Sequence, residues 1–118
     1  MLVCDDDSIS LRALEYQFKK DGFDVLKTNN GREAQKILEE NSDIDMLVTD
    51  IFMPLMNGLE LITYVRKILQ RSITIIVVSG IVIEDTILHA FELGADSYIT
   101  KPFNLDELSR KVKYLLKK

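Results

Sequence analysis

The fold of this chain is decided by the stretch Met46-Leu47-Val48-Thr49-Asp50-Ile51-Phe52-Met53-Pro54, in which an apolar run ends at an aspartate. The run predicts a buried strand over 46–49, and Pro54 predicts that the chain then leaves the sheet as a loop over 54–58. An unpaired carboxylate buried at such a place costs several kcal/mol. Asp50 therefore needs a cation or hydrogen-bonding partners from elsewhere in the chain.

Strand and helix patterns alternate along the rest of the sequence. Apolar runs at 1–4, 23–26, 73–78 and 97–100 predict four more strands, and the β-branched run 73–78 is typical of a central strand buried on both faces. A turn is predicted at 28–31. Five helices are predicted between and after these strands, because apolar residues recur there at helical spacing. The first begins at a cap, Asp7 or Ser8, and ends before Gly22, and the fourth spans 84–93 and ends before Gly94. The apolar residues are Leu11, Leu14 and Phe18 in the first helix, Ala34, Ile37 and Leu38 in the second, Leu61, Val65, Ile68 and Leu69 in the third, and Leu105, Leu108, Val112, Leu115 and Leu116 in the fifth. This alternation predicts an α/β fold, a doubly wound five-stranded parallel sheet with five helices in a three-layer sandwich.

Length and composition restrict the function classes. The 118 residues suit one domain spanning 1–118, and the net charge of -4 argues against direct nucleic-acid binding by this domain. One cysteine, no apolar stretch of about 18 residues and no signal segment predict a soluble, cytoplasmic protein without membrane contact of its own. Because the sequence ends at Lys117-Lys118 directly after the last predicted helix, no effector domain is expected within it.

Polar residues follow four of the predicted strands. In doubly wound sheets the functional crevice lies beyond the carboxyl ends of the strands, where the strand order reverses. With the order 2-1-3-4-5, the reversal falls between the first and third strands. Asp5-Asp6, Asp50, Ser79 and Lys101 then converge on one edge of the sheet.

This set of side chains has a definite chemistry. Three neighbouring carboxylates repel one another and need a cation, and oxygen ligands without a nearby His or Cys favour Mg²⁺ over zinc. Lys101 can pair with Asp50 at rest and with an added anion afterwards, and Ser79 can hydrogen-bond the same anion. A carboxylate nucleophile, a divalent metal, a lysine and a hydroxyl are what phosphoryl transfer to an aspartate requires.

Five separated motifs, in order and spacing, resemble the receiver domain of two-component response regulators (the CheY-like family), and the resemblance covers the whole chain. They are Asp5-Asp6, Asp50 with Met53-Pro54, Gly58, Ser79-Gly80 and Lys101-Pro102-Phe103. The family's fold is flavodoxin-like, which agrees with the pattern above.

The resemblance implies roles for individual residues. Asp50 would be the phosphoacceptor, taking a phosphoryl group from a histidine of a sensor kinase. Asp6, Asp50 and the backbone carbonyl of Phe52 would bind Mg²⁺, and Asp5 would act directly or through a water.

Three further residues would sense the product. Ser79 and Lys101 would hold the phosphoryl oxygens, and Tyr98 would be an aromatic switch that moves inward with Ser79. The family also implies a cis peptide between Lys101 and Pro102, which X-Pro bonds tolerate at small cost.

The implied function is a phospho-accepting signalling domain, which catalyses only its own phosphorylation and dephosphorylation and is not otherwise an enzyme. Its partners would be a sensor histidine kinase and an output controlled through the face of the fourth helix, fifth strand and fifth helix. That face could also form a homodimer. Some charges on this face resemble those that pair across dimers of winged-helix transcription factors. They are Glu92, Asp96, Glu107, Lys111 and Lys113. The basic residue that this class has in its fourth helix is absent here, because Ile87 stands near its place.

Several alternatives remain. The chain could be the receiver module of a hybrid kinase or phosphorelay, or a degenerate receiver that only binds. A phosphatase of the haloacid-dehalogenase type needs a second aspartate where Phe52 stands, and a flavin-binding protein would suffer repulsion between the FMN phosphate and the aspartates at 5–7.

Two apolar residues depart from what speeds phosphoryl loss in the family. Phe52 stands two residues after Asp50, and Ile81 stands two after Ser79. The family places these side chains beside the path of the hydrolytic water, which neither can orient. We therefore predict a long-lived phosphoryl-aspartate.

Other conspicuous residues have simpler explanations. Asp7 is predicted to cap the first helix, His89 to lie at or near the surface of a helix, and Cys4 to pack in the core. The apolar run 81–83 either folds back on the core or contacts a partner.

Overall fold

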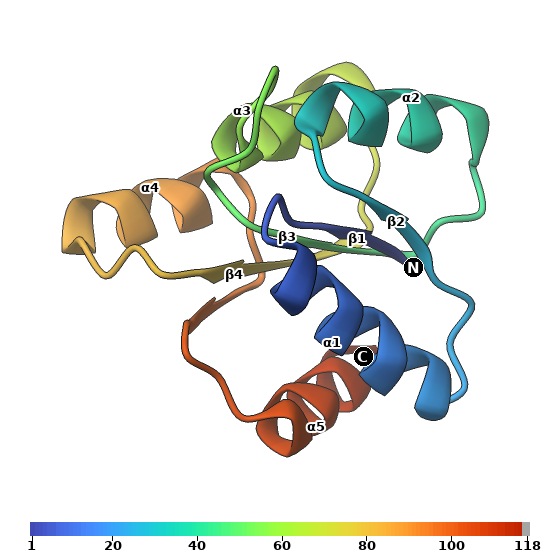
Figure 1. Cartoon of the computed structure of the whole chain (residues 1–118). Coiled ribbons are helices and arrows are strands. Elements are labelled where there is room, and N and C mark those ends of the chain that lie inside the picture. The colour runs from blue at the N-terminus through green and yellow to red at the C-terminus, as the bar shows by residue number, and fades with distance from the viewer. Residues whose placement is uncertain (117–118) are drawn as a thin grey trace.

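Five parallel strands form one sheet between two layers of helices (Figure 1). The computed structural model describes residues 1–116. The strand order is β2-β1-β3-β4-β5, as predicted. The strands are β1 Leu2–Cys4, β2 Leu26–Thr28, β3 Met46–Thr49, β4 Thr74–Ser79 and β5 Ser97–Thr100. The predicted Lys117-Lys118 ending lies outside the described residues.

Helices cover both faces of the sheet, with α1 and α5 on one side and α2 and α3 on the other (Figure 1). The helices are α1 Ser8–Lys20, α2 Gly31–Glu40, α3 Gly58–Thr63, the π-helical turn η1 Tyr64–Ile68, α4 Glu84–Leu93 and α5 Leu105–Leu116. Ala90 of α4 packs with residues of α2 and α3 in one core cluster, so α4 covers the same face as those helices. No helix in the described part of the chain is long and apolar enough to span a bilayer.

Local chemistry explains where these helices begin. The side chain of Asp7 caps α1 by accepting from the backbone N–H of Ile9, as predicted. Asn30 caps α2, and Asn57 caps α3 in a capping box with Glu60.

The second strand lies later than predicted. The prediction was 23–26, but β2 spans Leu26–Thr28 and includes Thr28, which the sequence suggested for a turn. Phe23 and Val25 instead pack against the core cluster beneath α1 and α5. Leu26 is 44% exposed on the edge strand, so β-sheet hydrogen bonding and not apolar burial fixes this strand.

The third helical segment also differs from a regular helix. Leu61 and Val65 are buried as their spacing suggests, but Ile68 is 68% exposed. The backbone N–H of Leu69 donates to the carbonyl of Tyr64, five residues earlier, and this π turn changes which side chains face the sheet.

Register places the functional residues. Cys4 of β1 pairs with Thr49 of β3, so Asp5 and Asp50 leave the sheet at the same level on neighbouring strands. Ser79 pairs with Thr100, which brings Lys101 beside the end of β4. The buried residues of β3 and β4 make this edge a rigid base for the site.

Candidate functional site

Three carboxylates gather at the carboxyl ends of β1 and β3. One carboxylate oxygen of Asp5, one of Asp6 and one of Asp50 lie within 4.8 Å of one another. Asp5 and Asp50 are buried, with 1% and 8% exposure, whereas Asp6 is exposed. The sequence predicted this convergence, and the sheet register produces it.

Lys101 provides the opposite charge. Its Nζ lies 2.7 Å from Asp5 Oδ2 and 3.0 Å from Asp50 Oδ2. Burial alone would lower the pKa of Lys101, but its hydrogen bonds to both carboxylates outweigh burial and raise that pKa. Burial raises the pKa of Asp5, and the hydrogen bond from Lys101 opposes the shift only in part.

Backbone amides hold the two buried carboxylates in place. The N–H of Ile51 donates to Asp50 Oδ1 at 2.6 Å, and the N–H of Asp7 donates to Asp5 Oδ1 at 2.9 Å. These bonds leave the Oδ2 atoms facing Lys101, so the side chains present fixed oxygens to the crevice.

The donor set fits a hard divalent cation. Within the described chain the cluster contains three carboxylates, while Lys101 contributes a single positive charge. Oxygen ligands with an excess of negative charge and one solvent-exposed member suit a cation that keeps several waters, as Mg²⁺ does.

Ser79 and Tyr98 meet at Ile81, beside the cluster. Ser79 is 1% exposed, and its Oγ accepts from the backbone N–H of Ile81 at 3.2 Å. The hydroxyl of Tyr98 donates to the carbonyl of Ile81 at 2.8 Å, and burial raises the pKa of this phenol. Tyr98 is already half-buried, packed against the core cluster that contains Ala90.

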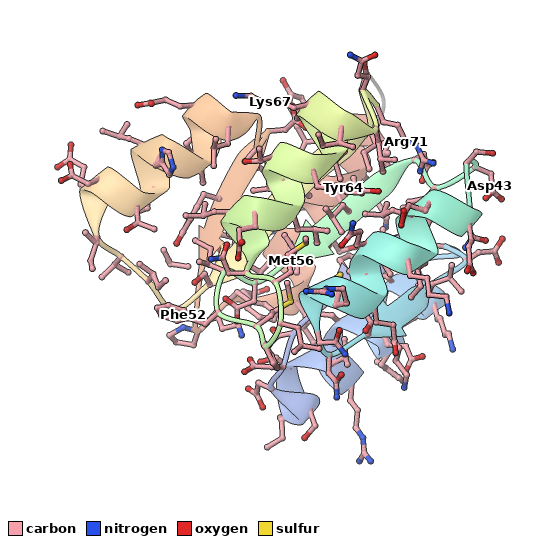
Figure 2. The ribbon with its side chains drawn as sticks, turned by 90° about the horizontal axis from the view of Figure 1, so that it is seen from above. Asp43, Phe52, Met56, Tyr64, Lys67 and Arg71 are labelled. Carbon is pink, nitrogen blue, oxygen red and sulfur yellow. The ribbon has the colours of Figure 1, made fainter. Side chains whose placement is uncertain are left out.

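The loop after Asp50 approaches the site closely. A Cβ atom on Gly58 would lie 2.1 Å from the carbonyl oxygen of Asp50, so only glycine fits there. Phe52 lies in this loop with its side chain 68% exposed (Figure 2). The peptide between Lys101 and Pro102 is cis, as the resemblance implied.

One contact was missed from the sequence. The hydroxyl of Thr49 donates to the carbonyl of Asp50 at 2.8 Å and is buried. A threonine that ends an otherwise apolar strand next to the key aspartate is a signal for such a contact.

Comparisons with known proteins agree with this geometry. Residues 1–113 match the model of the response regulator receiver domain family. The chain belongs to the receiver domains of response regulators. It is 37% identical over 118 residues to the transcriptional regulatory protein PrrA of Mycobacterium tuberculosis. The matched region covers 100% of this chain and 50% of PrrA.

Solved structures of receiver domains have the same fold. A CheY-like receiver domain protein from Methanospirillum hungatei is 28% identical, with a TM-score of 0.92 over 98% of this chain and 91% of that one. The receiver domain of a signal transduction histidine kinase from Syntrophus aciditrophicus is also 28% identical, with a TM-score of 0.87 over 98% of this chain and 88% of that one. The chain thus spans about half the length of curated relatives such as PrrA and nearly all of these receiver structures.

Cys4, His89 and the run 81–83 lie largely where the sequence suggested. Cys4 is buried in the core, and His89 is exposed on α4. The run 81–83 was predicted either to fold back on the core or to contact a partner. Ile81 packs against the core, whereas Val82 and Ile83 are 67% and 63% exposed.

Proposed function

We propose that the chain forms one receiver domain, over 1–118, that accepts a phosphoryl group on Asp50. The observation that carries the proposal is the approach of Asp5, Asp6 and Asp50 within 4.8 Å, with Lys101 bridging two of them. An oxygen of Asp50 attacks the phosphorus of a phosphohistidine on a sensor kinase. The P–N bond breaks, its electron pair stays on the imidazole nitrogen, and an acyl phosphate forms.

Asp5, Asp6, Asp50 and the backbone carbonyl of Phe52 would hold Mg²⁺. This ion would neutralise charge on the transferring phosphoryl oxygens. Asp5 would contribute directly or through a bound water, and its fixed Oδ1 orients the remaining oxygen toward the crevice.

Lys101 and Ser79 would hold the product. Lys101 is shared by two carboxylates at rest, so it can move from Asp50 to a phosphoryl oxygen without leaving Asp5. If Ser79 donates its hydroxyl to the phosphoryl group, its oxygen turns away from the N–H of Ile81. Tyr98 would respond because it binds the carbonyl of the same residue.

Labelling by a small phosphodonor tests the site. Incubation with acetyl phosphate should add one phosphoryl group in the presence of Mg²⁺ and none with EDTA, as measured by intact mass. Asp50→Asn should abolish the addition, whereas Asp7→Asn, a cap outside the cluster, should keep it. Labelling that survives in Asp50→Asn would refute the assignment.

The partners belong to the same proposal. A sensor histidine kinase would supply the phosphoryl group, and the face of α4, β5 and α5 would pass the signal to an output. The likeness to a receiver domain from a histidine kinase makes the receiver module of a hybrid kinase or phosphorelay the second candidate. Phosphotransfer in a mixture of purified candidate kinases with the full-length protein would distinguish the two.

A homodimer through that face stays a prediction. Two of its five candidate charges are engaged within the chain, because Asp96 pairs with Arg66 and Lys113 pairs with Asp21. Sedimentation with and without beryllofluoride, a phosphoryl mimic, would show whether the protein forms a dimer through the other three charges.

A further inference from the structure

Arg66, on the π turn η1, makes an unusually complete set of contacts. Its Nε and Nη2 donate to the carbonyl of Gly94 at 3.1 and 2.8 Å. Its Nη1 donates to the carbonyls of Arg71 and Ile73 at 2.9 and 2.7 Å. Nη2 also donates to Asp96 Oδ2 at 3.1 Å, so each guanidinium nitrogen has at least one partner.

These acceptors belong to segments that are separate in the sequence. Gly94 ends α4, Asp96 precedes β5, and Ile73 precedes β4. Asp96 Oδ2 also accepts from the backbone N–H of Ile75 at 2.8 Å. One guanidinium therefore joins the π turn η1 to the C-terminal end of α4 and to the segments that lead into β4 and β5.

The π turn brings Arg66 to this place. The C-terminal end of α4 lies beside the turn that carries Lys67 (Figure 2). A Cβ atom on Gly94 would lie 2.7 Å from Cγ of Arg66, so the side chain packs directly on the glycine. Gly94 has φ of 124°, a left-handed conformation that suits glycine.

The two ends of α4 differ strongly. At the C-terminal end, Ala90 is fully buried, and the backbone N–H groups of Gly94 and Ala95 donate to the carbonyls of Phe91 and Ala90 in a Schellman motif. At the N-terminal end, Ile83 provides no side-chain cap. No residue from 80 to 89 is fully buried.

The hydrogen bonds of Ser79 and Tyr98 reach the loop before the loosely held end. Ser79 and Tyr98 both hydrogen-bond the backbone of Ile81, two residues before Ile83. A change in the hydroxyl of Ser79 therefore acts on the loop that leads into α4, far along the helix from Gly94.

We propose that Arg66 pins the C-terminal end of α4 through Gly94, so that only the N-terminal part of this helix moves as a lever. Rearrangement is then confined to residues 80–87. Arg66 is a positioning residue, since its hydrogen bonds go to Gly94, Arg71, Ile73 and Asp96 and to none of the three carboxylates of the site. The part of the proposal that concerns movement rests on the phosphoacceptor function, whereas the pin itself does not.

Hydrogen exchange read by peptide mass spectrometry tests the pin first in the unphosphorylated protein. Arg66→Lys keeps the charge but lacks the planar fork that binds several carbonyls at once. We expect exchange in residues 88–95 to accelerate about 10- to 100-fold, as loss of bonds from a charged donor predicts. Exchange in β1 and β3 should stay within about 3-fold of the wild type.

Two other variants sharpen this comparison. Lys67→Met removes a charge from the same turn at an exposed position and should leave residues 88–95 unchanged. Arg66→Gln should exceed the effect of Arg66→Lys, and if it prevents folding, Arg66→Lys alone decides. Equal acceleration in every segment would mean that Arg66 only adds overall stability, and no acceleration in residues 88–95 would mean that it pins nothing. Either result overturns the proposal.

Beryllofluoride with Mg²⁺ then tests the lever. In the wild type, the change in exchange should be confined to residues 80–87, and in Arg66→Lys it should extend through residue 95. A wild-type change that reaches residues 88–95 equally would overturn the lever. Absence of any response in the wild type would overturn the lever and count against the phosphoacceptor site, but the variant's effect without beryllofluoride would still establish the pin.

Discussion

Replacing Asp5 by asparagine should stabilise the metal-free protein, although it removes an ion pair. Asp5 is 1% exposed, and its oxygen lies within 4.8 Å of oxygens on Asp6 and Asp50. With an effective dielectric constant of about 20, each repulsion at that distance is about 3.5 kcal/mol, and attraction to Lys101 at 2.7 Å is about 6 kcal/mol. Attraction and repulsion nearly cancel, so the cost of desolvating the carboxylate decides the sign.

The expected gain in the free energy of unfolding is on the order of 1–3 kcal/mol at neutral pH. Asparagine is nearly isosteric, its Oδ1 can still accept from the N–H of Asp7, and Lys101 keeps Asp50 as its partner. Urea unfolding in EDTA measures this gain. Asp7→Asn provides the matched control, because asparagine caps a helix as well as aspartate does and Asp7 lies outside the cluster.

Magnesium and a fall in pH should each diminish the advantage of Asp5→Asn. Mg²⁺ should stabilise the wild type by binding to its folded state, and it should stabilise the variant less because a ligand charge is gone. Burial raises the folded-state pKa of Asp5 above its ordinary value of 3.8, so the charged form is the costly one in the folded protein. The wild-type penalty is therefore present above the raised pKa and disappears as pH falls to 3.8. A variant less stable than the wild type in EDTA at pH 7 would refute this account.

Four other variants give expected outcomes of different kinds. Gly58→Ala should destabilise the fold by about 2–4 kcal/mol in urea unfolding, because its Cβ would lie 2.1 Å from the carbonyl oxygen of Asp50. Gly80→Ala, where a Cβ meets nothing within 4 Å, should change stability by less than about 1 kcal/mol. Phe52→Asn combined with Ile81→Glu should shorten the lifetime of the phosphoryl group after labelling with acetyl phosphate, and an unchanged decay rate would contradict the predicted role of these apolar side chains. Lys101→Met should leave Asp5 and Asp50 without their cation, so it should lower the free energy of unfolding by about 2–4 kcal/mol in EDTA, and Mg²⁺ should restore part of the loss.

The sequence predicted the alternation of strands and helices because strong, local patterns define it, and the convergence of the site followed once the order 2-1-3-4-5 was adopted. The apolar run before Asp50 and the β-branched run 73–78 define the two central strands, and parallel pairing then aligns their carboxyl ends. The edge strand β2 was placed too early because the apolar Phe23 and Val25 precede it, whereas Leu26 and Lys27 within it are exposed.

The contacts of Arg66 could not be predicted from the sequence. Its acceptors are mostly backbone carbonyls, which every sequence offers, and they are gathered by a π turn without a distinctive sequence signature. The exposure of Ile68 has the same origin, because helical spacing assumes a period that the π turn breaks. Side-chain chemistry at strand ends is thus more predictable than side-chain contacts to irregular backbone.

The cost of the acidic cluster explains why it is built at the ends of paired, fully buried strands. Like charges would separate if the loops that carry them were free to move, and the cation site would be lost. Here β1 and β3 pair in a register that places Asp5 and Asp50 side by side, and the N–H groups of Asp7 and Ile51 fix one oxygen of each. A cation bound there would relieve this repulsion, so the instability of the metal-free cluster would appear as affinity for the metal. The opposite holds at Gly80–Ile83, where few contacts fix the chain and where the proposed signal must produce movement.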